Sequence, residues 1–461
     1  MISALTTDLY QLTMAAGYWR ADHVCPATFE LFVRRLPSRR SFLVTAGLDQ
    51  ALDYLEHLRF TDEERTWLRE RPQFAKVPGE FFDDYLRSFR FTGDVWAMAE
   101  GTPVFANEPL LRVTASLPEA QLVETALLAI VSFQTSVASK AARIVHAAQG
   151  RAVVEFGARR AHGVDSALAA ARASFIGGCQ GTSLVEAARR FGVPASGTMA
   201  HSWVQAFPTE RDAFIEFSRS FSESAVYLLD TYDTLAAARS LVASGLRPPM
   251  VRLDSGDLDA LSREVRRILD QSGLRSTKIF ATGDLDEHRI AALVAAGAPV
   301  DGFGVGTALS TVSDAPALSA VYKLVEVRGR GDRDATGVVK LSPGKETWPG
   351  QKQVWRFMRS GRAAGDVIGA ADEPAPEGGV ALLKPAMRAG KRLIPSVPLP
   401  ELCADCRRSI DTLPEDVRAL DAGSDIYPVR MSDRLQDARS VLSHRSPVSG
   451  RSQPVRPTTD G

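Results

Sequence analysis

The chain has 461 residues, of which 45% are hydrophobic and 24% are charged, a composition typical of a globular protein with two or three domains. Lysine plus arginine and aspartate plus glutamate both number 55, so the formal charge is zero, which argues against nucleic acid or an anionic membrane as the main partner. The N-terminus has no signal-peptide pattern and no apolar run reaches membrane-spanning length, so we expect a cytoplasmic protein.

Residues 1–117 predict a small N-terminal α+β domain. Short apolar runs predict strands at Phe29–Val33, Val95–Met98 and Leu110–Val113, and Asp62–Arg71 predicts a helix. Pro118 then opens a long helical region that ends near Gly150.

A second pattern begins at Ala152, where short strand-like runs alternate with amphipathic helices. The predicted strands are Val153–Phe156, Ser174–Ile176, Ala195–Met199, Val226–Leu229, Met250–Leu253, Lys278–Ala281 and Val300–Phe303. The predicted helices between them are Leu184–Arg190, Thr234–Val242, Leu258–Leu269 and Asp286–Ala296. Such alternation indicates an α/β fold with a parallel sheet, and so many short units favour a β/α barrel, complete or incomplete. In such barrels the loops after the strands form the active face. We therefore expect residues 118–327 to be the catalytic domain.

The pattern breaks after Val325. Arg328–Asp334 predicts a charged loop, and residues 359–380, rich in glycine, alanine, proline and acid, predict a mobile surface segment. We expect residues 328–445 to pack on the N-terminal domain and residues 446–461, which have little apolar content, to be a disordered tail.

Four cysteines do not make a disulfide framework in a chain of this length. Cys403 and Cys406 form one C-x-x-C, but a structural zinc site needs a second pair, and Cys25 and Cys179 are isolated. We expect a reduced pair in a surface loop.

Polar residues follow the predicted barrel strands at their carboxyl ends. The segments are Glu155–Arg160, Gly177–Ser183, Gly197–Ser202, Leu229–Asp233, Arg252–Asp257, Thr282–Asp284 and Gly302–Thr307. They supply a phenylalanine beside two arginines, two glycine-rich turns, a histidine and several carboxylates. Val251–Leu258 is the most informative of them, because it sets one cation and two carboxylates around a Ser-Gly turn.

Each feature also has a purely structural interpretation. Tight backbone geometry alone explains one glycine-rich turn, and a lone histidine is often a structural hydrogen-bonding group. Arg159 or Arg160 could form a surface ion pair. Asp254 and Asp257 could cap the next helix. Together, however, glycine-rich turns and arginines suit phosphate, a phenylalanine suits stacking on a planar ring, and carboxylates near phosphate suit Mg²⁺ held through water. The set indicates a phosphorylated substrate, a planar anionic substrate and magnesium.

At these residues the chain resembles the nicotinate phosphoribosyltransferases. The resemblance spans Thr7 to about Gly350 and rests on Thr7–Met14, Phe29–Phe32, Glu155–Arg160, Gly197–Val204, Val251–Leu258, Gly302–Thr307 and Val321–Leu324. It implies a barrel of the type II phosphoribosyltransferase kind, with an N-terminal domain completed by C-terminal segments. It also implies an ATP-coupled ligase that joins nicotinate and phosphoribosyl pyrophosphate into nicotinate mononucleotide, the first step of NAD salvage from nicotinate.

The resemblance also implies roles for single residues. His201 matches the histidine that ATP phosphorylates transiently, Asp230 the carboxylate that orients it through its other ring nitrogen, and Arg252 and Asp254 the catalytic pair after the strand. Phe156 would stack on nicotinate, and Arg252 would hold the nicotinate or the phosphoribosyl group, with Asp254 near the ribose. Tyr10 would cover the nicotinate ring from a neighbouring subunit, which implies a homodimer with shared active sites. The implied phosphoribosyl pyrophosphate ligands are Arg159, Asp257, Gly283, Asp284, Gly304, Val305, Gly306, Thr307 and Lys340.

The residues fit this chemistry and favour one of its possible pyridine substrates. The pyridine nitrogen of nicotinate carries no proton at neutral pH, so positioning and electrostatics dominate and no general base is needed. Ser183 stands where the related nicotinamide enzymes carry an aspartate, and a neutral hydroxyl does not repel a carboxylate substrate. We therefore expect nicotinate as substrate, with nicotinamide or quinolinate as the alternatives. Two alternatives belong to other functional classes: a non-catalytic nucleotide sensor, and a partner-binding module at Cys403–Cys406.

Overall fold

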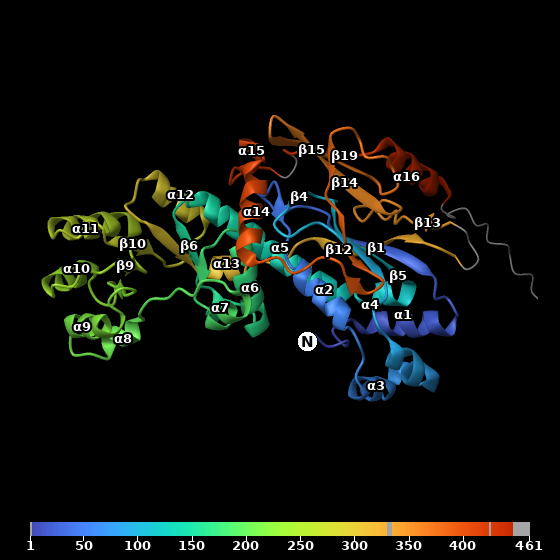
Figure 1. Cartoon of the computed structure of the whole chain (residues 1–461), viewed down its shortest axis with the longest axis horizontal. Helices are drawn as coiled ribbons and strands as arrows, with labels where there is room; N and C mark the ends of the chain where they lie inside the picture. The colour runs from blue at the N-terminus through green and yellow to red at the C-terminus, as the bar shows by residue number, and fades with distance from the viewer. Residues whose placement is uncertain (1, 330–333, 424–425, 446–461) are drawn as a thin grey trace, which may run out of the picture.

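The computed structural model describes residues 2–329, 334–423 and 426–445, which build two adjoining cores (Figure 1). The first contains a seven-stranded sheet in the order β13-β12-β1-β5-β3-β17-β18. Its strands are β1 (Pro26–Val33), β3 (Asp94–Ala97), β5 (Pro109–Ser116), β12 (Ala320–Val327), β13 (Thr336–Gly337), β17 (Lys384–Arg388) and β18 (Lys391–Arg392). Helices α1 (Leu9–Arg20), α2 (Leu48–His57), α3 (Asp62–Arg69) and α4 (Leu117–Leu122) belong to this domain.

The C-terminal part of the chain completes this domain. β14 (Lys352–Arg359), β15 (Arg362–Ala370), β16 (Gly379–Ala381) and β19 (Val429–Met431) form a second sheet, and β17 pairs with β3 of the first. Val354, Ile368 and Met387 are buried in the N-terminal core. The predicted mobile segment at 359–380 is therefore wrong, because β15 lies within it and its Asp366 is buried in an ion pair with Arg356, 2.6 Å between Nη2 and Oδ2.

The second core is an incomplete barrel of six parallel strands in the order β7-β6-β11-β10-β9-β8. The strands are β6 (Ala152–Glu155), β7 (Gly181–Thr182), β8 (Val226–Leu228), β9 (Met250–Leu253), β10 (Lys278–Ala281) and β11 (Gly302–Val305). No ladder among the described residues joins β7 to β8, so the curled sheet stays open. Its helices include α6 (Val164–Ile176), α7 (Val185–Phe191), α10 (Thr234–Ala243), α11 (Leu258–Gln271) and α12 (Glu287–Ala295). The predicted α/β fold with an incomplete barrel is confirmed.

Two predicted strands are wrong. Ser174–Ile176 is the last turn of α6, because it continues a run of helix-favouring alanines that buries one face. Ala195–Met199 forms no strand, and Ala195 makes a single bridge to Thr182. Short apolar runs fit either element, so only their neighbours decide.

The C-x-x-C is also placed differently from the prediction. Cys403 and Cys406 lie on helix α14 (Leu399–Asp411), and Cys406 is buried against Gly101, so the pair is part of a packed helix instead of a surface loop. Within the described residues, no cluster with the composition and spacing of a metal site contains a cysteine. The predicted loop at Arg328–Asp334 and the predicted disordered tail lie partly or wholly outside the described residues. None of the described helices combines the length and apolarity needed to cross a bilayer.

Helix α5 (Glu124–Ala147) joins the two cores through a buried cluster of charges. Lys140 Nζ lies 2.6 Å from Glu287 Oε2 and 2.8 Å from Asp314 Oδ1, and Arg143 Nε lies 2.9 Å from Glu287 Oε1. Burial alone would raise the pKa of Glu287, but Lys140 and Arg143 outweigh it, so that pKa lies below its usual value. Asp314, between Lys140 and Arg40, has a lowered pKa for the same reason.

We expect Glu287→Gln to lower the free energy of unfolding by about 3 kcal/mol, because it leaves two buried cations with too little negative charge. A carboxylate with a lowered pKa stabilises the fold above its unfolded-state pKa, and this contribution is lost as the pH falls towards the folded-state pKa. Urea titrations between pH 7 and pH 3 measure both effects, and the variant should lose less stability than the parent over that range. Equal slopes against pH would contradict this role for Glu287.

Candidate active site

The polar residues gather at the carboxyl ends of the parallel strands, as the fold requires. Arg252, on β9, is buried and donates from Nε to Thr282 Oγ1 (2.8 Å), from Nη1 to Thr198 Oγ1 (2.8 Å) and from Nη2 to Asp254 Oδ1 (2.6 Å). Burial alone would raise the pKa of Asp254. Hydrogen bonds from Thr282 and Arg252, together with the electrostatic effect of the facing His201, outweigh burial and hold that pKa below its usual value. The strand end therefore presents a fixed cation and an ionised carboxylate.

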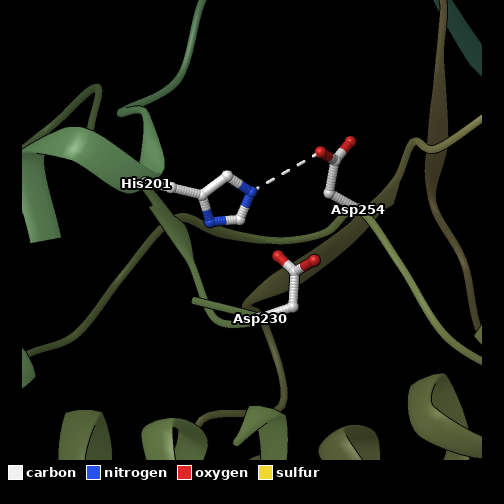
Figure 2. Close-up of side chains that lie close together, drawn as sticks. All are labelled: His201, Asp230 and Asp254. Atoms are coloured by element: carbon white, nitrogen blue, oxygen red, sulfur yellow. Dashed lines mark ion pairs between the residues drawn. The ribbon is translucent and has the colours of Figure 1, made fainter. Parts of the chain in front are cut away.

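His201 begins the short helix α8 (His201–Gln205) and faces this pair. Its Nε2 lies 3.7 Å from Asp254 Oδ2, and Nδ1 forms a hydrogen bond of 3.2 Å with Thr231 Oγ1. Figure 2 shows the carboxylates of Asp230 and Asp254 both directed towards the imidazole. One ligand atom from each of these three residues lies within 4.8 Å of the others.

The pairing of His201 differs from the expected one. Asp230 was expected to orient the histidine through its other ring nitrogen, but Thr231 holds that nitrogen. The Asp230 carboxylate instead accepts a hydrogen bond of 2.5 Å from Ser255, and its buried Oδ1 has no hydrogen-bond partner among the residues that the structure describes. The reason is a tertiary contact: Ser255, at the end of β9, donates to the Asp230 carboxylate, while Thr231 meets the imidazole.

Phe156 follows β6 and provides an aromatic wall beside Arg252, whose Cζ lies 5.7 Å from the ring centroid. Gly304 on β11 makes room for this ring, because a Cβ there would lie 2.8 Å from Phe156 Cδ2 and 2.6 Å from Thr282 Cγ2. Phe156 is partly exposed, and an aromatic ring suits stacking on a planar ligand.

Glu155, buried beneath Phe156, organises the adjacent turns. Its carboxylate accepts hydrogen bonds from Thr182 Oγ1 (2.6 Å) and the Gly157 backbone, and its carbonyl accepts from Ser183 N (2.9 Å). Burial raises the pKa of Glu155 above its usual value. Ser183 itself is exposed at the strand ends.

Two glycine-containing turns lie beside these side chains. Gly304 and Val305 end β11, and Gly306 precedes Thr307, the first residue of α13 (Thr307–Ser310). Gly283, at φ +95°, lies so close to the β9 loop that a Cβ would come within 1.9 Å of Asp254 O. The structure therefore brings Gly283 and the predicted glycine-rich turn at Gly302–Thr307 to the same edge of the sheet. The other predicted glycine-rich turn is placed differently, because Gly177 and Gly178 end α6 and precede β7, at the amino end of that strand.

The remaining predicted phosphate ligands lie around this edge. Arg159 is exposed after β6, and Asp284 follows Gly283 with φ +46°. Asp257 caps α11 by accepting from Ala260 N (3.1 Å), so the capping interpretation holds for it.

Tyr10 and Lys340 lie on other elements. Tyr10 is 49% exposed on α1, and its hydroxyl donates to Glu124 Oε2 at 3.2 Å. Lys340 is exposed in the loop after β13, where its backbone exchanges hydrogen bonds with Thr347. Figure 1 shows α1 and β13 at the opposite end of the molecule from β9 and β10. Neither residue is therefore brought to the barrel edge of its own chain.

Comparison with known proteins identifies the family. Residues 5–132 match the nicotinate phosphoribosyltransferase N-terminal domain, and residues 152–336 match the nicotinate phosphoribosyltransferase family. Nicotinate phosphoribosyltransferase pncB2 of Mycobacterium tuberculosis is 46% identical over 453 residues, covering 96% of this chain and 94% of that protein. This chain belongs to the nicotinate phosphoribosyltransferase family.

Other relatives agree with this assignment. The nicotinate phosphoribosyltransferase of Bacillus subtilis is 45% identical over 383 residues, covering 80% of this chain and 76% of that protein. The crystal structure of human nicotinic acid phosphoribosyltransferase superposes with a TM-score of 0.81 at 30% identity, covering 95% of this chain and 99% of that chain. The fold that the resemblance implied is thus found in a solved member of the nicotinate phosphoribosyltransferase family.

Three threonines of this nicotinate phosphoribosyltransferase site were not predicted as site residues. Thr198 and Thr282 hold Arg252, and Thr231 holds His201. All three lie inside segments that the sequence singled out, but a threonine in such a segment is common. The sequence alone does not predict that these threonines lie next to His201 or Arg252 in the folded protein.

We expect Gly304→Ala to lower activity by about 100-fold, because the added methyl displaces the Phe156 ring or the Thr282 side chain by part of an ångström. Steady-state rates of this variant can be compared with those of Gly17→Ala, at a glycine of α1 with an ordinary helical backbone where a Cβ meets no atom within 4 Å. Activity of the Gly304 variant equal to that of the control would show that the ring position is not critical.

Proposed function

We propose that this chain transfers the phosphoribosyl group of phosphoribosyl pyrophosphate to nicotinate, with ATP hydrolysis coupled through a phosphohistidine at His201. The overall reaction takes nicotinate, phosphoribosyl pyrophosphate, ATP and water to nicotinate mononucleotide, pyrophosphate, ADP and phosphate. The observation that carries the proposal is the arrangement of Arg252, Asp254 and His201 beside Phe156. Family membership at 46% identity supports it.

Nicotinate would stack on Phe156 with its carboxylate towards Arg252. A guanidinium has five N–H donors, and the protein uses three of them here, which leaves one donor on each of Nη1 and Nη2. Two parallel donors match a carboxylate. Ser183 adds a neutral hydroxyl at the same edge, so nothing on that turn repels the acid. Tyr10 of a second copy would cover the ring, in a homodimer with shared sites.

Phosphoribosyl pyrophosphate would lie along the two glycine turns, with backbone N–H groups of Gly304–Thr307 and Gly283 towards its phosphates. Arg159 would add positive charge, Asp257 and Asp284 would lie near the ribose, and Lys340 would reach the phosphates from a second copy. Asp230 and Asp254 offer oxygen atoms near His201, which suit Mg²⁺ held partly through water and phosphate. Bound Mg²⁺ would neutralise the charge of the departing pyrophosphate.

The three chemical steps need little acid–base chemistry from the protein. The ring nitrogen of nicotinate forms a bond to the ribose C1 as the bond from C1 to pyrophosphate breaks, so positioning by Phe156 and Arg252 is the main requirement. A ring nitrogen of His201 attacks the γ-phosphorus of ATP and ADP leaves. Water later hydrolyses the phosphohistidine. The Thr231 hydrogen bond supports this role because it fixes the orientation of the imidazole.

An assay of purified protein with phosphoribosyl pyrophosphate and Mg²⁺ tests the proposal. Nicotinate, nicotinamide and quinolinate are offered separately, with and without ATP, and the mononucleotide product is followed by chromatography. Product from nicotinate alone, increased by ATP, is the expected result. Product from nicotinamide or quinolinate would contradict the assigned substrate, and no product from any of the three would favour a nucleotide sensor.

A further inference from the structure

Thr282, which directly follows β10, joins the two charged groups at the end of β9. Its hydroxyl accepts a hydrogen bond of 2.8 Å from Arg252 Nε and donates one to Asp254 Oδ1. Arg252 Nη2 closes the ring by donating to the same carboxylate oxygen at 2.6 Å. One hydroxyl therefore contacts both the cation and the anion of the site.

The position of this hydroxyl is fixed by the backbone. Thr282 is 3% exposed, and its N donates to Leu253 O at 2.8 Å. The next residue, Gly283, comes so close to the β9 loop that no side chain fits between Gly283 and Asp254 O. The Thr282 methyl group packs against Gly304. The hydroxyl is thus held from three sides and water has little access to it.

The charges on either side also fix the direction of the hydroxyl proton. Arginine can only donate and an ionised aspartate can only accept, so the threonine oxygen must accept from Nε and its hydrogen must point to Asp254. The Leu253 carbonyl, 3.3 Å from the same oxygen, is the more distant acceptor. One orientation of the Thr282 hydroxyl therefore gives Arg252 Nε an acceptor and Asp254 a donor at the same time.

We infer that Thr282 is a positioning residue for the nicotinate carboxylate, acting through Arg252: its hydroxyl fixes the plane of the guanidinium so that the remaining donors on Nη1 and Nη2 face the substrate. This inference rests on the proposed function. Without the hydroxyl, Nε would be a buried donor lacking an acceptor, and the guanidinium would rotate to recover one. Such a rotation moves the two remaining donors away from the substrate carboxylate.

The test replaces Thr282 by valine, which keeps the shape and removes the hydroxyl, and by serine, which keeps the hydroxyl. Thr277→Val is the matched control, because Thr277 is equally buried at the other end of the same strand and donates to Pro248 O at 2.7 Å. Rates of mononucleotide formation give kcat and KM for nicotinate and for phosphoribosyl pyrophosphate. Thermal melting monitors the fold, and wild-type activity on nicotinate is measured first.

We expect Thr282→Val to lower kcat/KM for nicotinate by about 100-fold, mainly through KM for nicotinate, with KM for phosphoribosyl pyrophosphate little changed. Serine should restore most of the activity, and Thr277→Val should act like the wild type. If the valine variant does not fold, alanine against serine at 282 decides, since they differ by the hydroxyl oxygen alone. Equal kinetics with and without the hydroxyl, or a loss shared by both substrates, would overturn the inference. Inactive wild type would instead contradict the proposed function.

Discussion

Replacing Arg252 by alanine should lower the rate of nicotinate mononucleotide formation by about 1000-fold. Among the site residues described above, Arg252 is the cation that lies against both the Phe156 ring and the Asp254 carboxylate, and the substitution removes it. Arg252→Lys should recover little of the loss. A lysine keeps the charge, but it has no planar fork to bind a carboxylate while also contacting Thr198 and Thr282.

Arg252→Ala should lower the free energy of unfolding by only about 1–2 kcal/mol. Asp254 keeps the hydrogen bond from Thr282, and its side chain is 28% exposed, so water can replace the lost guanidinium. Arg266→Ala is a suitable control, because Arg266 belongs to the same β/α unit but contacts Thr277 O and Leu274 O at the other end of the strands. Steady-state kinetics and thermal melting of the three variants check the prediction. A large fall in melting temperature for Arg252→Ala alone would indicate a structural role.

The sequence predicted the location of this site because of one geometric rule. The carboxyl ends of parallel strands meet at one edge, so the segments after β6, β9, β10 and β11 had to converge there. Phe156 after β6 and Thr282 after β10 lie beside Arg252 and Asp254 of β9 for that reason. His201 reaches the same edge, although the run before it, Ala195–Met199, is not a strand. Strand identity was less secure: the β9 and β10 ranges were predicted correctly, whereas the run at Ser174–Ile176 proved to be helical.

The partners within the site could not be predicted in the same way. Asp230 and Thr231 are neighbours in the chain, and only the conformation of the loop after β8 decides which of them meets His201. The resemblance to the family implied the aspartate, and it carries no information about this loop's conformation. The competing hydrogen bond from Ser255, twenty-five positions along the chain, is a tertiary contact with no local signal.

Replacing His201 by alanine should leave slow synthesis of nicotinate mononucleotide but remove its stimulation by ATP. The variant retains Arg252 and Phe156, which would position nicotinate, so transfer from phosphoribosyl pyrophosphate continues. It lacks the imidazole that would accept the γ-phosphoryl group, so ATP hydrolysis should stop and the ratio of rates with and without ATP should fall to about one.

A second histidine provides the control for this experiment. His57 Nδ1 lies 3.3 Å from the Asp53 carboxylate on α2, so His57→Ala also removes a histidine paired with an aspartate, but within the N-terminal domain. That variant should keep both ATP hydrolysis and ATP stimulation. Parallel assays of ADP and mononucleotide, together with acid-labile ³²P incorporation from γ-labelled ATP, separate the two steps. Undiminished ATP stimulation in His201→Ala would show that phosphoryl transfer uses another group, while loss of all synthesis would mean that His201 acts in phosphoribosyl transfer itself.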